Sequence, residues 1–228
     1  MRYRSPLRKS LREGFYDEEG FLNGLFATPQ VFAFNTNLVQ QNEAPKSIDD
    51  LFQPKWKGKL AMDQYAYDWL AALLDHYGEE RGKQIARRLG EQSLQIRRGP
   101  NLIMQLVAAG EFPIVIDGYL HEAMQTRSAG APISYVIPEP FVPVITPTNA
   151  YASSRPPHPH AMALFLDFLL SKDGQMVMKG HGRWVSHREI ISPELGDKKT
   201  LIPSPSKWGD REKELGRLFD QLLRQVKP

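Results

Sequence analysis

The sequence contains no cysteine and no long apolar run. Without cysteine, its 228 residues offer no thiol nucleophile, no disulfide framework and no cysteine-ligated zinc site. No stretch of about eighteen consecutive apolar residues occurs, so the sequence predicts no membrane-spanning helix. It begins MRYRSPLRKSLREGF, which is charged but lacks the apolar segment of a secretory signal.

Catalytic and nucleotide-binding motifs are also missing. The sequence has no GxSxG, GxxxxGK[ST], HExxH or GxGxxG pattern. Its 29 Lys and Arg exceed its 26 Asp and Glu by three, but these charges are spread along the chain, whereas a nucleic-acid footprint needs a clustered basic face. We therefore predict no enzyme, no nucleic-acid partner and no cofactor.

Short apolar strands alternate with amphipathic helices through the middle of the chain. The pattern predicts strands at 31–34, 59–62, 94–98, 112–117, 132–138 and 142–145. Helices are expected at 68–78, 79–91, 99–111 and 119–130, and a short one at 48–52 with Ser47 as its N-cap. The first thirty residues predict loops with little core. Such an alternation is typical of an α/β protein.

Three further helices are predicted in the last third of the chain, one of them a short helix at 175–184 after a break at Gly174. The stretch HPHAMALFLDFLLSKDGQ, from His158, is apolar on too many sides for a surface helix, with a wide stripe of Ala161, Leu164, Phe165, Phe168 and Leu169. The tail forms an amphipathic helix that should dock on the body through Leu215, Leu218, Phe219, Leu222 and Val226.

Five segments occur in an order that points to a family. They are NTNLV, APKSIDDLFQPKWKGKLAM, a GE before an apolar strand, GAPISYVIPE and HPHAMALFLDFLLSKDGQ, within 31–190. This arrangement resembles the bacterial extracellular solute-binding proteins of ABC importers, and most closely the branch of the ferric-ion-binding proteins.

The resemblance implies a periplasmic-binding-protein-like two-lobe α/β fold with central mixed sheets. Residues 1–37 would be a remnant of the first lobe with the first crossover strand, 38–140 the second lobe, and 141–228 the return crossover and the C-terminal helices of the first lobe. The helix from His158 would be a core helix of the first lobe, covered by sheet on one side and by the terminal helix on another.

The first lobe is expected to be incomplete. In the family, a signal peptide and a β/α section precede the crossover, whereas this chain has about thirty residues there. We therefore expect an N-terminally truncated binding protein that binds ligand weakly or not at all by itself. A genuine single-lobe derivative is the alternative.

The function implied by the resemblance is capture of a small ligand in the inter-lobe cleft and its delivery to an ABC transporter permease. The ligand would be a metal ion such as Fe(III), carried as cargo, or a small organic or phosphate-bearing anion. The full-length protein would be a periplasmic monomer. A ligand-sensing module of a regulator or receptor, or a non-functional fragment, are the alternatives.

Tyr119 is the one residue that the resemblance implies as a metal ligand. In the ferric-binding branch two adjacent tyrosines coordinate iron at this point, but here Leu120 replaces the second. His121 could join such a site, although neighbours two apart do not share a helix face. His158 and His160 lack companion ligands at useful spacing, so no metal clip is predicted there.

Other candidate ligand-binding residues follow the predicted strands. The junction after 59–62 carries Asp63, Gln64, Tyr65 and Tyr67, where backbone N–H groups and a helix dipole favour anions. The alternative is a capping turn with Asp68 as N-cap. After 94–98, Arg97 or Arg98 could clamp a carboxylate or phosphate, unless they are simply exposed. Thr146, and more weakly Asn149, are candidates near the return strand.

Overall fold

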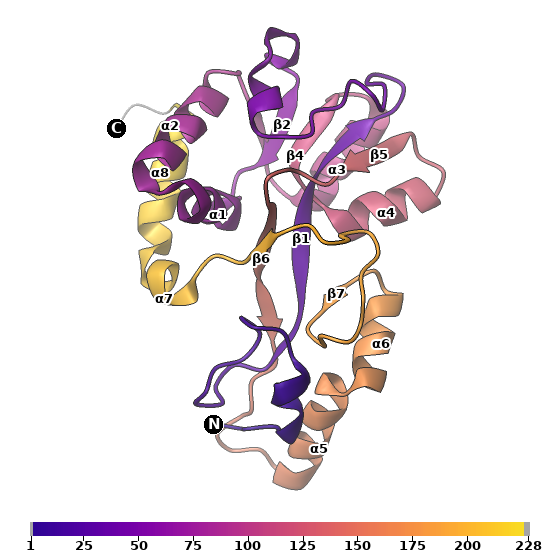
Figure 1. Cartoon of the computed structure of the whole chain (residues 1–228), viewed down its shortest axis with the longest axis vertical. Helices are drawn as coiled ribbons and strands as arrows, with labels where there is room; N and C mark the ends of the chain where they lie inside the picture. The colour runs from indigo at the N-terminus through magenta and orange to yellow at the C-terminus, as the bar shows by residue number, and fades with distance from the viewer. Residues whose placement is uncertain (1, 226–228) are drawn as a thin grey trace. The chain divides into compact units, whose positions relative to one another are not determined.

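A computed structural model describes residues 2–225 and divides the chain into two compact units (Figure 1). The first unit comprises Met1–Thr28 and Thr146–Gly196, and the second comprises Pro29–Ile145 and Asp197–Pro228. Two of the three boundaries fall inside strands, β1 (Gly24–Asn35) and β6 (Val142–Asn149), and the third follows Gly196. None of the described helices is both long and apolar enough to cross a membrane.

A mixed sheet organises the second unit. The strand order is β3-β2-β4-β1-β6-β8, with β2 (Leu60–Asp63) parallel to both β3 (Gln95–Arg97) and β4 (Ile114–Tyr119). Strand β1 runs antiparallel to β4 and to β5 (Ile133–Val136), and β6 is parallel to β8 (Thr200–Leu201). Strands β2 and β4 are apolar and almost wholly buried, as expected for parallel strands covered on both faces.

Helices cover the sheet of the second unit in two groups (Figure 1). Helices α1 (Tyr67–Tyr77), α2 (Glu79–Gly90) and α8 (Glu212–Leu222) pack on one another. Helices α3 (Pro100–Ala109) and α4 (Leu120–Ser128) form the other group, against β4. The short elements are η2 (Asp49–Phe52), η3 (Pro54–Trp56), α7 (Pro205–Trp208) and η4 (Gly209–Arg211). The core fills this unit, with Trp69, Leu70, Phe34 and Phe219 fully buried.

Glycines set the helix boundaries here. Gly78 ends α1 at a φ of 80°, and Gly110 ends α3 in the left-handed region, conformations that a side chain disfavours. Gly90 lets α8 approach α2, because a Cβ there would lie 2.2 Å from the carbonyl oxygen of Leu222. The Ser47 hydroxyl accepts from the Asp50 N–H, but η2 begins at Asp49 and its N-cap is Ile48 rather than the predicted Ser47.

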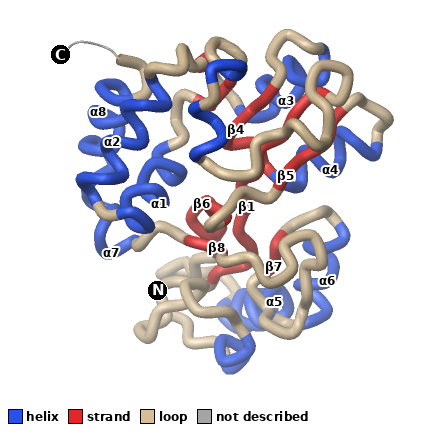
Figure 2. Tube along the Cα trace, turned by 45° about the horizontal axis from the view of Figure 1, so that its top comes forward, coloured by secondary structure: helices blue, strands red, loops and turns tan. Residues whose placement is uncertain are grey.

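The first unit is smaller and richer in loops (Figure 2). It contains η1 (Pro6–Ser10), the start of β1 paired with β7 (Trp184–Val185), and helices α5 (Pro159–Leu170) and α6 (Lys172–Gly180). Gln175 of α6 is fully buried, and its amide oxygen accepts from the backbone and hydroxyl of Ser186. The prediction of little core before residue 30 was wrong, since Leu11, Phe15 and Ala27 are buried in this unit.

The predicted surroundings of α5 were also wrong. Only Leu166 and Leu170 of this helix are buried, whereas the stripe residues Leu164, Phe165 and Phe168 are exposed. Nor does the terminal helix α8 cover it, because α8 packs on α1 and α2 in the second unit. The segment 197–228 therefore groups with 29–145 rather than with the first lobe, where the sequence had placed it.

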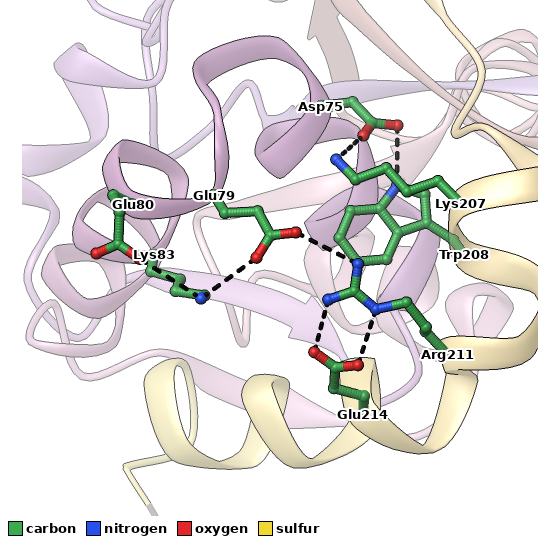
Figure 3. A network of polar contacts seen from close by, with 8 residues as sticks. All are labelled: Asp75, Glu79, Glu80, Lys83, Lys207, Trp208, Arg211 and Glu214. Carbon is green, nitrogen blue, oxygen red and sulfur yellow. Dashed lines mark hydrogen bonds and ion pairs between the residues drawn. The ribbon is translucent and has the colours of Figure 1, made fainter.

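Polar contacts fix this C-terminal segment on α1 and α2 (Figure 3). Asp75 accepts from Lys207 Nζ at 2.7 Å and from the indole N–H of Trp208 at 2.9 Å. Arg211 bridges Glu214 and Glu79 at the surface. Leu215, Phe219 and Leu222 supply the apolar contact, and Leu218 packs at its edge, as the helical pattern predicted; Val226 lies outside the described residues.

Candidate ligand-binding site

Three loops meet at one edge of the second unit's sheet. Because β2 is parallel to β3 on one side and to β4 on the other, the carboxyl ends of all three strands lie at the same edge. Ligands of open α/β sheets bind at such edges. The ends of these strands and the segments that follow them carry seven of the eight predicted ligand-binding residues: Asp63, Gln64, Tyr65, Tyr67, Arg97, Arg98 and Tyr119.

Asp63 ties two of these loops together. Its side chain is buried, and its two oxygens accept from the backbone N–H groups of Tyr65 and Gly99, each at 2.7 Å. Gly99 has a φ of 97°, a conformation that suits glycine and presents its N–H to the carboxylate. Asp63 therefore stabilises the conformation of these loops, and each of its carboxylate oxygens already accepts a hydrogen bond from the backbone.

Asp117 connects the third strand to this arrangement. It is buried within β4, and its carboxylate accepts from the Asp63 N–H at 3.1 and 3.3 Å. Burial raises the pKa of Asp117 to about 7, and the charge of Asp63 adds to the rise, while the hydrogen bond from the Asp63 N–H opposes it. Sequence reasoning missed this residue, although an acid inside the apolar run IVID was a visible signal.

Tyr119 stands at the end of β4 and directly precedes α4. Its ring stacks on that of His121, with centroids 5.8 Å apart and planes at 25°. Burial raises the pKa of the Tyr119 phenol well above its usual value, and the nearby carboxylates of Asp117, Asp63, Glu122 and Asp68 raise it further. The phenol is therefore protonated at neutral pH and can donate a hydrogen bond. His121, which the helix-face argument placed partly away, contacts Tyr119.

Tyr65 and Arg98 form the exposed part of this edge. The Tyr65 ring is 55% exposed, and the Arg98 guanidinium lies 6.0 Å from its centroid. In the part of the chain that the structure describes, no carboxylate pairs with Arg98 within 4.0 Å. An aromatic face and a positive charge thus stand together on the surface.

The remaining candidates serve other contacts. Tyr67 packs edge-on against Phe219 of α8, at 5.7 Å, and Gln64 accepts from Arg224 Nη2, so both hold the C-terminal segment. Arg97 lies over the Phe112 ring and donates to the Ile96 carbonyl, and it lines a cavity of about 390 Å³ together with Arg224. Asp68 lies in the first turn of α1, whose N-cap is Ala66.

Thr146 lies in the first unit, within β6, and its side chain is outside the described part of the structure. Asn149 lies on the same strand and donates to the Pro147 carbonyl. The predicted ligand contacts of these two residues stay a prediction.

A buried glutamine was missed beside Tyr119. Gln30 of β1 pairs in register with Tyr119, is 2% exposed, and donates weakly to the Asp117 carbonyl at 3.5 Å. Its amide oxygen has no hydrogen-bond partner among the described residues. A glutamine inside the run PQVFAFN was the signal in the sequence. Because its amide oxygen is unsatisfied, Gln30 can accept a further hydrogen bond on the strand that pairs with Tyr119.

The donor set at this edge is poor for a metal. Among residues 2–225, no three His, Asp or Glu side chains gather in a way that could hold a metal ion. Tyr119 offers one phenol, and the carboxylates around it favour its protonated form. Residues 158 and 160 form no such group either.

Comparison with known proteins now identifies the fold. The family model described as "Bacterial extracellular solute-binding protein" matches residues 2–213. The chain belongs to this family. A curated relative of this solute-binding protein, the Fe(3+)-binding periplasmic protein of Serratia marcescens, is 24% identical over 68% of the chain. The chain spans about half (48%) of the length of that relative.

Solved structures agree with the family fold. The ferric iron-binding protein A of Mannheimia haemolytica, in an open conformation, has a TM-score of 0.81 at 15% identity, covering 100% of this chain and 77% of its own. AfuA of Actinobacillus pleuropneumoniae, with fructose-6-phosphate bound, has a TM-score of 0.78 at 22% identity, covering 99% and 77%. Iron-bound HitA of Pseudomonas aeruginosa has the same score at 19% identity, covering 95% and 75%. At identities below 25%, these TM-scores show a shared fold alone.

Proposed function

We propose that this solute-binding protein is the substrate-binding component of an ABC importer and takes a small organic anion at the strand-end edge of its second unit. The family match supports the transport role. The observation that carries the ligand class is the pair of Arg98 and Tyr65, an exposed cation beside an exposed ring. Its partners would be the ligand and a membrane permease, and its place of action the periplasm.

Each residue at this edge has a role in the proposal. Arg98 would pair with a carboxylate or phosphate, and a bidentate contact would fix its orientation. Tyr119 would donate its phenol hydrogen to the ligand, beside the Gln30 amide oxygen as an acceptor for a ligand hydroxyl. Asp63 and Asp117 would hold the loops without touching the ligand.

A metal ion is the second candidate ligand. Tyr119 in acidic surroundings supports it, because a trivalent cation would be attracted to those carboxylates and could displace the phenol proton. The single phenol and the engaged oxygens of Asp63 weigh against it.

Binding measurements on matched variants test the proposal. Calorimetric titration with fructose-6-phosphate and, separately, with ferric citrate would compare the wild type with Arg98→Gln and Tyr119→Phe. We expect the sugar phosphate to bind weakly, as the sequence predicts for this chain by itself, with affinity falling roughly tenfold or more in Arg98→Gln, about the loss of one charge-assisted contact.

Arg87→Gln is the matched control, since Arg87 is an exposed arginine in the last turn of α2. Affinity should be unchanged in this variant. A different outcome would favour the metal ion as ligand: binding of ferric citrate but not of the sugar phosphate. That binding would be lost in Tyr119→Phe and unchanged in Arg98→Gln. No binding to either compound would contradict the anion site in this chain.

A further inference from the structure

The end of the C-terminal segment contacts the loop that carries Tyr65. Arg224, two residues beyond the end of α8, donates from Nη2 to the side-chain oxygen of Gln64 at 3.2 Å and to its backbone carbonyl at 3.5 Å. Gln64 is the first residue after β2 and directly precedes Tyr65, the exposed ring of the candidate site. A guanidinium from the far end of the chain therefore holds the beginning of this loop.

A row of aromatic rings makes a second connection between α8 and the same loop. Phe219 of α8 is fully buried, and the Tyr67 ring meets it edge-on with centroids 5.7 Å apart. Tyr67 also meets the Tyr65 ring edge-on, at 6.0 Å, which is a favourable arrangement of two rings. The guanidinium of Arg98 lies 6.0 Å from the Tyr65 centroid. The row thus runs from the buried side of α8 to the exposed cation of the site.

Helix α8 also approaches the phenol end of Tyr67. A Cβ at Gly216 would lie 3.4 Å from the Tyr67 hydroxyl oxygen, so the helix backbone passes close to this group. Burial raises the pKa of Tyr67, and the charge of Asp220 raises it further while that of Arg224 opposes the rise. Tyr67 is therefore in contact with α8 along its whole side chain.

The Tyr65 ring has less support than its neighbours in this row. The Tyr65 N–H donates to Asp63, which fixes the backbone, but the ring itself is 55% exposed. A ligand binds more tightly to a side chain whose orientation is already set, because less conformational freedom is lost on binding. The orientation of the Tyr65 ring consequently depends on what holds Gln64 and Tyr67.

We propose that the C-terminal segment positions the ligand-binding loop, with Arg224 as the positioning residue. Arg224 fixes Gln64, and α8 fixes Tyr67, so that the Tyr65 ring stands beside Arg98 before a small anion arrives. Arg224 itself does not touch the ligand. The inference rests on the proposed function, since it gives a role in that site to a residue 160 positions away from the loop.

Arginine substitutions within the C-terminal segment separate positioning from general stability. Arg224→Met keeps an apolar stem but removes the donors to Gln64, whereas Arg224→Lys keeps a charged donor. Arg211→Met is the matched control, because Arg211 holds the same segment through Glu79 of α2 and Glu214 of α8 rather than through the loop. Circular dichroism melting confirms that all three variants are folded.

Hydrogen exchange followed by mass spectrometry observes the loop without any ligand. We expect the backbone amides of residues 64–67 to exchange about tenfold faster in Arg224→Met, the factor for loss of one charge-assisted hydrogen bond. Exchange in Arg211→Met and in Arg224→Lys should stay within about twofold of the wild type. Unchanged exchange in Arg224→Met, or an equal increase in Arg211→Met, would overturn the proposal.

Titration with fructose-6-phosphate measures the consequence for binding. Affinity should fall about fivefold in Arg224→Met, recover for the most part in Arg224→Lys and stay unchanged in Arg211→Met. Faster exchange in Arg224→Met without a loss of affinity would overturn the positioning role. A wild type that does not bind the sugar phosphate would contradict the proposed function, and the exchange rates alone would then decide whether Arg224 positions the loop.

Discussion

Helices α1 and α5 have similar apolar compositions but opposite fates. Helix α1 buries six of its eleven residues against β-strands, α2 and α8, whereas α5 buries two of its twelve. The difference lies in the partners: the second unit supplies a sheet and a terminal helix, and the first unit supplies α6, the short η1 and loops. The apolar composition of a helix indicates that it favours burial. Whether it is buried depends on which other elements of the fold pack against it.

The largest effect is expected from the same substitution made on both helices. Leu70→Ala, on α1, should lower the free energy of unfolding by about 4 kcal/mol, because Leu70 is fully buried and truncation leaves a cavity. Leu164→Ala, on α5, should change it by less than about 0.5 kcal/mol. Urea unfolding at low protein concentration, followed by tryptophan fluorescence, measures both. Equal losses would mean that α5 is covered after all.

The next largest effect is expected in the pH dependence of the free energy of unfolding, which Asp117 of the second unit should govern. Since the pKa of Asp117 rises to about 7 on folding, the folded state holds a proton that the unfolded state loses above about pH 4. The stability that this group contributes is therefore lost as pH rises from about 4 to 7, by on the order of 4 kcal/mol. Asp117→Asn should be free of this decline and still accept the Asp63 N–H. Parallel pH profiles of the two proteins would contradict this burial.

The smallest effects concern how the C-terminal segment is held. Asp75→Ala should lower the free energy of unfolding by about 2 kcal/mol. The substitution leaves the indole N–H of the buried Trp208 and the ammonium group of Lys207 without their acceptor. Glu214→Ala removes a surface pair with Arg211 and should cost less than about 1 kcal/mol. Limited proteolysis should then release the C-terminal segment sooner in Asp75→Ala than in Glu214→Ala. Faster release in Glu214→Ala than in Asp75→Ala would mean that the Arg211 ion pairs hold the C-terminal segment more strongly than Asp75 does.

Much of the fold could be predicted because its signals are local. The strands around Met62 and Ile116 are short apolar runs, and glycines such as Gly78 and Gly110 mark where helices end. The family follows from the order of such segments. The direction in which α5 faces was not predictable, because a helix that is apolar on most sides gives no preferred side.

The candidate site could be predicted only in its position. Strand ends drew attention to Tyr119, Tyr65 and Arg98, which the structure keeps at one edge. Tyr67 contacts Phe219, and Gln64 contacts Arg224, in a segment more than 140 positions away. A local sequence pattern carries no information about such contacts. Asp117 and Gln30 were missed for a related reason, since polar residues inside apolar strands gain a role only from what packs beside them.

The close approach of α8 to Gly90 has a consequence for how the protein is made. Helix α2 is synthesised long before α8, yet the space above Gly90 is filled only by the last part of the chain. The second unit therefore cannot complete its core while the ribosome still holds those residues.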